Sequence, residues 1–143
     1  MINEDLKLRG DVAIVLKDKN GNVKESREIN NLVVTAGLTF ICARMAAASA
    51  DVMSHMALGS GTTAAAAGDT DLESILGSRE ALDSTSASSN TITYVSSFEA
   101  GEGTGAVTEA GVFNAASSGT MLCRTVFAVV NKAADDTMSV TWT

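Results

Sequence analysis

The segment "TEAGVFNAASSGTMLCRTVF", residues 108–127, decides the fold of this chain. Two apolar runs flank the small residues "NAASSG", and this arrangement is typical of a β-hairpin. We predict strands over residues 106–113 and 121–129, joined by a turn near residues 117–119. The segment holds no catalytic pair, no metal-ligand cluster and no basic patch, so its packed surface is itself a candidate for the function.

Further strands are predicted on both sides of this hairpin. In "NTITYVSSF" and in "TMSVTW", apolar side chains alternate with Ser and Thr, which is the period of a strand. Asn20-Gly21 fits the left-handed backbone of a tight hairpin turn. We therefore predict strands over 11–16, 22–29, 52–58, 91–98 and 137–142. The polar return strand 22–29 is typical of an edge strand or a projecting arm.

One helix is predicted within "NNLVVTAGLTFICARMAAASA", residues 30–50. Leu38, Ile41, Cys42 and Met45 recur at the spacing of one buried helical face, and Thr35 can cap the helix start. We expect this helix over residues 36–47. The predicted fold is mainly β: a β-sandwich of jelly-roll or immunoglobulin-like type with one α-helix. Residues 1–30 form an N-terminal hairpin or arm, and residues 31–143 form the sandwich domain.

Composition excludes several classes of protein. The chain has 143 residues, enough for one domain with its own core, and a net charge of −7. Its ten scattered Lys and Arg residues argue against nucleic-acid binding. The polar start "MINEDLKLRG" is no secretory signal, and no apolar run approaches the roughly 20 residues of a membrane span. We expect synthesis in a reducing cytoplasm, with neither nucleic acid nor membrane as a partner.

The two cysteines, Cys42 and Cys123, lie within apolar runs far apart in the sequence. We interpret them as buried free thiols, because cysteine behaves as a small hydrophobic residue. A bridge between them stays open at this point. The chain also contains no proline, which removes one common protection of strand edges, so neighbouring subunits could cover those edges.

The single histidine, His55, is the first candidate for catalysis. A Ser-His-Asp site would need it to meet a serine and a carboxylate, and the chain lacks a G-x-S-x-G elbow. Ser54 is its neighbour, so on a strand the two side chains would point to opposite faces. We interpret His55 as a partly buried, hydrogen-bonded residue without a catalytic role.

Three further stretches superficially suggest ligands. "GSGTTAAAAGD" lacks the lysine of a phosphate loop, and "GEGTG" is followed by no helix pattern, so both are interpreted as loops. Asp69, Asp71 and Glu73 alternate and could bind Ca²⁺, but the EF-hand spacing fails. A solvated loop capping a helical turn at residues 71–76 explains the same carboxylates. We predict no catalytic, cofactor-binding or metal-binding residues.

Three other acidic residues lie near the glycine-rich stretch of residues 101–105. They are Glu99, Glu102 and Glu109, and nothing in their spacing marks two of them as an acid/base pair. Together with the preceding points, the sequence predicts a protein that is not an enzyme.

Four blocks of the sequence resemble small structural proteins of tailed-bacteriophage virions, variously tail-fibre, tail-collar or capsid decoration proteins. The blocks are "NLVVTAGLTFICARM", "MSHMALGSGTTAAAAGDTDLES", "TEAGVFNAASSGTMLCRTVF" and "KAADDTMSVTWT". The resemblance runs from about residue 31 to the end of the sequence, and it carries no catalytic residues. It implies that the 108–127 hairpin is central to a sandwich. The core expected from it is Phe113, Leu122, Val126, Phe127 and Trp142.

The resemblance leaves two functions open. The first is a homotrimeric capsid decoration or cement protein, which binds the major capsid protein at the virion surface. The second is a host-recognition module on a tail fibre, tailspike or baseplate, in which loops such as "DSTSASSN" meet a glycan. Because the sequence has neither heptads nor repeats of a fibre shaft, decoration is favoured.

Overall fold

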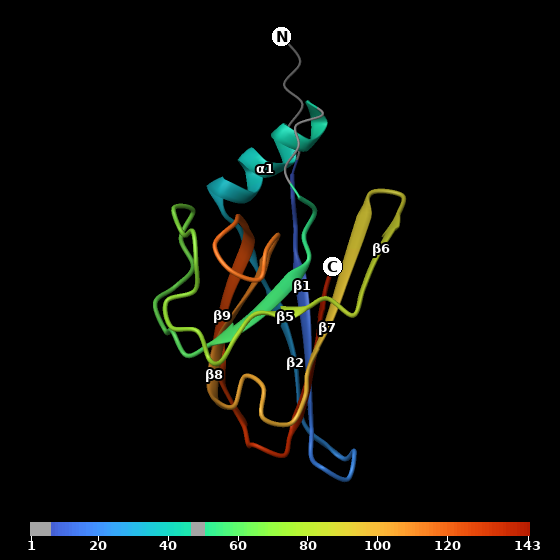
Figure 1. The fold of residues 1–143 in the computed structure, drawn as a ribbon, viewed down its shortest axis with the longest axis vertical. Helices are drawn as coiled ribbons and strands as arrows, with labels where there is room; N and C mark the ends of the chain where they lie inside the picture. The colour runs from blue at the N-terminus through green and yellow to red at the C-terminus, as the bar shows by residue number, and fades with distance from the viewer. Residues whose placement is uncertain (1–6, 47–50) are drawn as a thin grey trace.

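The computed structural model describes residues 7–46 and 51–143. Within them, two five-stranded antiparallel sheets pack face to face, and one helix lies at an end of the sandwich (Figure 1). The prediction of a mainly β sandwich with one helix is confirmed.

The strand order of each sheet shows how the chain crosses between the layers. Sheet A has the order β2-β1-β10-β7-β6, and sheet B has the order β3-β9-β8-β4-β5. Sheet A consists of β1 (Asp11–Lys17), β2 (Val23–Asn30), β6 (Ser84–Ser88), β7 (Thr91–Phe98) and β10 (Thr137–Trp142). Sheet B consists of β3 (Leu32–Val33), β4 (His55–Gly59), β5 (Glu80–Ala81), β8 (Gly105–Phe113) and β9 (Met121–Lys132). The seven predicted strands are therefore present, with ends shifted by up to three residues.

The core lies between the two sheets and follows the alternation of the strands. Large buried side chains there contribute roughly 1.5–3 kcal/mol each. They include Val12, Ile14, Leu16, Met56, Leu58, Phe98, Val107, Val112, Val130, Met138, Val140 and Trp142. A smaller cluster of Val34, Ala57, Phe113 and Met121 lies apart from this core.

The expected core residues divide into two groups. Phe113 and Trp142 are fully buried, whereas Leu122, Val126 and Phe127 are only partly buried. All five were expected in the core because the resemblance implied them, but Val126 and Phe127 are neighbours, and the side chains of neighbouring residues point to opposite faces of a strand. A loop also covers the outer face of sheet B, so burial in β9 extends to the polar Arg124. Thr125 is buried on the opposite side, which it shares with Cys123, and its hydroxyl donates to the carbonyl oxygen of Asn30.

The N-terminal hairpin is part of the sandwich. β1 lies between β2 and β10, and its alternate residues enter the core. Gly21 adopts φ 82° in the turn, and the Asp18 carboxylate accepts hydrogen bonds from the backbone N–H groups of Asn20 and Asn22. The predicted turn and the edge position of β2 are confirmed. Of the two interpretations of the polar return strand, the edge strand is the one observed over the described residues, because β2 pairs with β1 at the end of sheet A; residues 1–6 lie outside the described residues.

Helix α1 (Thr35–Met45) differs from its prediction in two respects. Thr35 is its first helical residue rather than its cap, and Val34 occupies the cap position without a side-chain hydrogen bond. Leu38 and Met45 are 44% and 80% exposed, so the expected buried face was wrong. Only Gly37 of the helix is buried, because it packs directly against the backbone of Leu122. The contact requires glycine, since a Cβ there would lie 2.1 Å from the carbonyl oxygen of Leu122. Residue 47, the predicted end, lies outside the described residues.

Three strands were missed by sequence reasoning. β3 and β5 have two residues each, and β6 occupies the stretch interpreted as the loop "DSTSASSN". β6 escaped notice because its residues are small and polar, so that no apolar alternation marks it. The helical turn expected at residues 71–76 was also wrong: Ile75 forms an antiparallel bridge with Gly59.

Candidate functional site

The outer face of sheet B carries the densest group of buried charges among the described residues. Glu109 on β8 and Arg124 on β9 are 0% and 2% exposed. Arg124 is paired with Gly111, two residues from Glu109, so both side chains project from the same face. The loop of residues 60–76, at the left of Figure 1, covers them. We call Glu109, Arg124, Asp69 and Glu73 the Glu109 cluster.

The Glu109 carboxylate accepts hydrogen bonds from three backbone groups of this loop. Oε1 accepts from the N–H groups of Gly61 and Ser74, at 2.9 and 2.8 Å, and Oε2 accepts from that of Glu73 at 3.1 Å. Nε of Arg124 also donates a hydrogen bond to Oε2, at 2.9 Å, and Nη2 of Arg124 lies 2.8 Å from the same oxygen. The buried charge is therefore paired and hydrogen-bonded, which removes most of its desolvation cost.

Arg124 links this carboxylate to the rest of the loop. Its Nη1 lies 2.8 Å from Oδ2 of Asp69, and its Nη2 donates to the carbonyl oxygen of Thr63 at 3.1 Å. Burial alone would lower the pKa of Arg124, but its hydrogen bonds to Asp69 and Glu109 outweigh burial and raise that pKa. The guanidinium thus holds two points of the loop, Thr63 and Asp69, on the sheet.

The other two carboxylates of the cluster are held mainly by the backbone. Asp69 accepts the N–H of Ala66, and this bond, with help from Arg124, lowers the pKa of Asp69. Glu73 accepts both the N–H and the hydroxyl of Thr63, and these bonds lower the pKa of Glu73. Both side chains are therefore stabilised in their ionised form.

Two glycines of "GSGTT" allow the loop to approach Glu109. A Cβ on Gly59 would lie 2.4 Å from Glu109 Oε1, and one on Gly61 would lie 2.6 Å from the same oxygen. Thr108 adds a hydrogen bond from its hydroxyl to the carbonyl oxygen of Gly61, at 2.7 Å. The stretch interpreted as a loop thus needs its glycines for close packing on a carboxylate, a different role from cradling a phosphate.

The three alternating carboxylates considered for Ca²⁺ are held by arginines and by Thr63, and Arg124 lies within ion-pair distance of both Asp69 and Glu73. Asp69 binds Arg124 and Glu73 binds Thr63, whereas Asp71 lies 3.3 Å from Nη2 of Arg79. Arg79 in turn stacks over the ring of Phe113, at 3.6 Å from its centroid. In residues 7–46 and 51–143, no group of three His, Cys, Asp or Glu side chains is placed to hold a metal ion.

His55 is partly buried and hydrogen-bonded, as predicted. Its Nδ1 lies 2.8 Å from the hydroxyl of Ser54, although the two were expected on opposite faces. The expectation failed because β4 begins at His55, so Ser54 precedes the regular strand. Among the described residues no carboxylate is hydrogen-bonded to His55, so the pair lacks the third member of a triad.

A further buried charge, Lys132, is the last residue of β9, at the opposite end of that strand from Leu122, on which α1 packs. Its Nζ donates to the carbonyl oxygens of Glu99 and Asp136, at 2.8 and 2.6 Å, and burial lowers the pKa of Lys132. Glu102 accepts the backbone N–H of Glu99 at 2.8 Å. Glu99, Glu102 and Glu109 therefore have different roles: the first two form local hydrogen bonds near Lys132, whereas Glu109 belongs to the Glu109 cluster.

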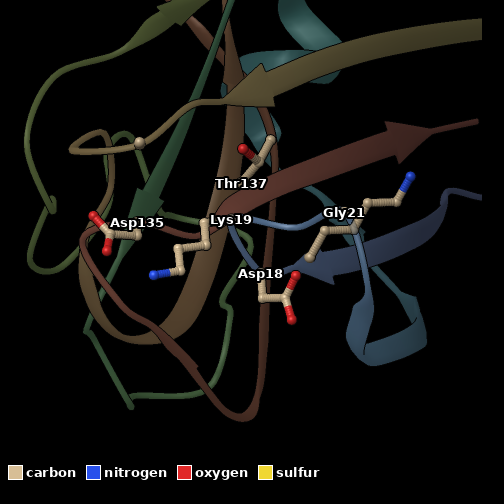
Figure 2. A pocket seen from close by; sticks show the side chains of 7 residues that line it. Asp18, Lys19, Gly21, Asp135 and Thr137 are labelled. Atoms are coloured by element: carbon tan, nitrogen blue, oxygen red, sulfur yellow. The ribbon is translucent and has the colours of Figure 1, made fainter.

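An open depression of about 600 Å³ lies at the same end (Figure 2). It is lined by Lys17, Asp18, Lys19, Gly21, Ala100, Asp135 and Thr137. Figure 2 shows its acidic and basic side chains extending in different directions. A small-molecule site needs convergent polar groups in an enclosed, mostly apolar pocket, and this depression lacks that arrangement.

The two cysteines are both free, and their environments differ. Cys123 is buried in the core, and burial raises its pKa to about 12. Cys42 is exposed on α1, which corrects the expectation of two buried thiols. The correction follows from the helix, since the stripe that contains Cys42 faces solvent.

The Glu109 cluster could be predicted only in part. Glu109 and Arg124 each interrupt an apolar strand of the 108–127 hairpin, and a charge at such a position signals a buried pair. No local signal connects them to a loop that precedes them by some 50 residues.

No helix in the described part of the chain has the length and hydropathy to cross a membrane. Comparisons of the chain with protein-family models, curated proteins and solved structures return no match.

Proposed function

We propose that the protein is a non-enzymatic structural component of a tailed-bacteriophage virion, and specifically a capsid decoration or cement protein. One observation carries the proposal: blocks that resemble virion proteins, although far apart in sequence, meet on one face of sheet B. Gly61 from "GSGTT", Glu109 from "TEAG" and Arg124 from "LCRTVF" are joined by hydrogen bonds. Gly37 from "NLVVTAG" packs on Leu122 of the same sheet. The resemblance thus rests on residues that build the scaffold.

The chemistry of this cluster supports a scaffolding role. A general base needs a lone pair that faces substrate, and a nucleophile needs an adjacent base. Glu109 is instead fully buried, and both of its carboxylate oxygens accept hydrogen bonds, from three backbone N–H groups and from Arg124. Asp69 and Glu73 are likewise engaged within the loop. These groups fix a long loop on a rigid sandwich, and a rigid surface is what a lattice-binding protein requires.

In this proposal the partners are further copies of the chain, in a homotrimer, and the major capsid protein. The protein is made in the host cytoplasm and is carried on the capsid surface. The net charge of −7 supports a protein partner over the packaged genome, because nucleic-acid binding needs clustered basic residues.

One feature favours the second candidate, a module of a tail fibre, tailspike or baseplate that recognises the host. The β6–β7 hairpin extends at the upper right of Figure 1, and every residue of β6 is exposed. Its side chains are Ser, Thr and Ala, and hydroxyl groups of this kind hydrogen-bond to sugars. In that case the hairpin would contact the host surface.

Copy number in purified virions tests the proposal and separates the two candidates. A decoration protein covers repeating lattice positions, whereas a tail component is confined to one vertex. We expect a gel band whose molar amount is comparable to that of the major capsid protein. A far fainter band would assign the protein to the tail. Absence from virions that are fully infectious would overturn both candidates.

Particles that lack the protein provide a second measurement. Heads without a cement protein should release their DNA at a lower temperature than wild-type heads, and added purified protein should restore the wild-type temperature. An empty-vector preparation is the control. Heads of unchanged stability that bind no added protein would overturn the capsid assignment.

A further inference from the structure

The two sheets have four edges, and three of them carry a recognisable protection against pairing with other chains. β3 and β5 each have two residues, too few for a continuous ladder. Because β3 pairs only with Cys123 and Arg124, the remainder of the twelve-residue β9 also lies at this edge of sheet B. β2 is eight residues long, but it bears Lys24, Glu25, Arg27 and Glu28, and its pairing with β1 includes a register shift. Short strands, charges and bulges are the usual devices that blunt an edge.

The fourth edge, β6, has none of these devices. Its five residues, "STSAS", carry no charge and pair with β7 in a continuous register from Ser84 to Ser88. All five are exposed, and the side of β6 away from β7 pairs with no strand in the described part of the chain. An unprotected, uncharged edge in a chain of net charge −7 marks a surface where another strand can add.

We propose that β6 pairs antiparallel with β6 of a second copy of this chain, about a two-fold axis at Ser86. The two copies of sheet A then form one continuous ten-stranded sheet. In this register Ser84 lies opposite Ser88 of the other copy, and Thr85 lies opposite Ala87. All facing side chains are small, so the backbones reach hydrogen-bonding distance without a clash.

Charge favours this occupant over β2, the other edge strand of sheet A. Pairing β6 with β2 of another copy would bring the four charged side chains of β2 against an uncharged strand and remove part of their water. Self-pairing avoids that cost. Asp83 is the charged residue next to β6, and it lies opposite Ser89 of the other copy. The two Asp83 residues are then six positions apart, about 20 Å, which exceeds the screening length of about 8 Å.

The exposed part of the hairpin adds apolar contact. Ile92 is 48% exposed and pairs with Ala87 across the hairpin. Across the two-fold axis, Ala87 lies beside Thr85 of the other copy, and Thr85 is paired with Tyr94. Self-pairing therefore places these four side chains in one row on the same face of the joined sheet, from Ile92 of one copy to Tyr94 of the other. The contact is isologous, so it doubles whatever unit the chain otherwise forms.

Complementary charge variants at Ser86 test the contact in solution. Light scattering and sedimentation at up to about 1 mM should give the wild type an even number of copies, because a contact this small is visible only at high concentration. Ser86→Lys and Ser86→Glu should each halve that mass, since like charges face each other at the axis. An equimolar mixture of the two should restore it.

The matched control is Ser26 on β2, the opposite edge of the same sheet, which is also exposed. Ser26→Lys and Ser26→Glu should leave the mass of the wild type unchanged. A wild-type monomer or trimer at the highest concentration would overturn the proposal. So would Ser86 variants that retain the full mass, or a mixture that fails to reassociate.

Disulfide trapping tests the register itself. Facing residues of an antiparallel pair are about 4.5–5.5 Å apart at Cα, within the range for a disulfide. In a Cys42→Ser background, Ser86→Cys should form a covalent dimer on mild oxidation, whereas Ser26→Cys should not. Equal cross-linking of the two would overturn the β6 contact. These measurements need no virion, so their failure is separate from failure of the proposed function.

Discussion

Arg124 and Glu109 lie on neighbouring strands and form a buried two-point ion pair, in which Nε and Nη2 of the arginine approach the same oxygen, Oε2, at 2.9 and 2.8 Å. The second oxygen of Glu109 accepts backbone N–H groups from residues 61 and 74. One carboxylate therefore joins two strands to the two ends of a loop.

Glu109→Gln should lower the free energy of unfolding by about 3–5 kcal/mol, because it removes the fully buried one of the two carboxylates that lie 2.8 Å from the guanidinium of Arg124. Denaturant titration measures the change, with the exposed Glu28→Gln as control. A Glu109→Leu/Arg124→Leu double variant should remain destabilised, since the loop N–H groups lose their acceptor. Wild-type stability of the double variant would show that the loop does not depend on this carboxylate.

Gly61→Ala should be destabilising by roughly 1–3 kcal/mol, the usual cost of overpacking. The new Cβ would lie 2.6 Å from Oε1 of Glu109 and 2.5 Å from Cβ of Glu73. Gly68→Ala is the matched control in the same loop, because a Cβ there has no heavy atom within 4 Å. Thermal unfolding of the two variants gives the comparison. Equal melting temperatures would contradict the close approach of the loop to Glu109.

Much of the fold follows from local sequence patterns. Strands with apolar alternation, such as β7 and β10, have the predicted bounds, because one of their faces is buried in the core. The turn at Asn20-Gly21 was recognisable because Gly21 needs a positive φ. β6 could not be recognised in this way: both of its faces are exposed, so no hydrophobic period distinguishes it from a loop.

Other features depend on tertiary contacts that no local pattern contains. The apolar spacing of α1 suggested a buried face that contains Leu38 and Met45, yet both are exposed. The helix packs instead through Gly37 and through the partly buried side chains of Ala36 and Phe40. The Glu109 cluster required knowledge that the 60–76 loop folds back over sheet B. The charges at Glu109 and Arg124 indicated burial, but not the partner that covers them.

Ile14→Ala should lower the free energy of unfolding by about 2–5 kcal/mol, because Ile14 is 1% exposed in the central position of β1. Val23→Ala, in the same hairpin but 59% exposed, should change it by less than about 0.5 kcal/mol. Denaturant midpoints measure both. A small effect of Ile14→Ala would restore the interpretation of the hairpin as a separate arm.

Cys42 should react with a thiol reagent in the native protein, whereas Cys123 should react only after unfolding. The first thiol is exposed, and the second is buried with a pKa of about 12, so its reactive thiolate is rare at neutral pH. A colorimetric titration should count one thiol per chain in buffer and two in denaturant. If Cys42→Ser no longer reacts in buffer, the thiol that reacts in the native protein is that of Cys42. Two rapidly reacting thiols in buffer would contradict the buried position of Cys123.

Acid should destabilise the protein through the loop carboxylates. Hydrogen bonds from the backbone N–H groups of Ala66 and Thr63 lower the pKa values of Asp69 and Glu73 from their ordinary values of 3.8 and 4.5. A carboxyl whose pKa is lower in the folded state contributes stability above its unfolded pKa. That contribution is lost as the pH falls through the folded pKa.

The free energy of unfolding should therefore decline from about pH 5 downward, as protonation of these carboxyls begins to favour the unfolded chain. Asp69→Asn/Glu73→Gln removes both titrations while it keeps an oxygen acceptor, so its profile between pH 7 and 3 should be shallower than that of the wild type. The exposed pair Asp83→Asn/Glu28→Gln serves as the control and should retain the wild-type slope. Urea titrations at several pH values supply the slopes. Parallel profiles for wild type and the loop variant would mean that the hydrogen bonds to Asp69 and Glu73 do not hold the loop in solution.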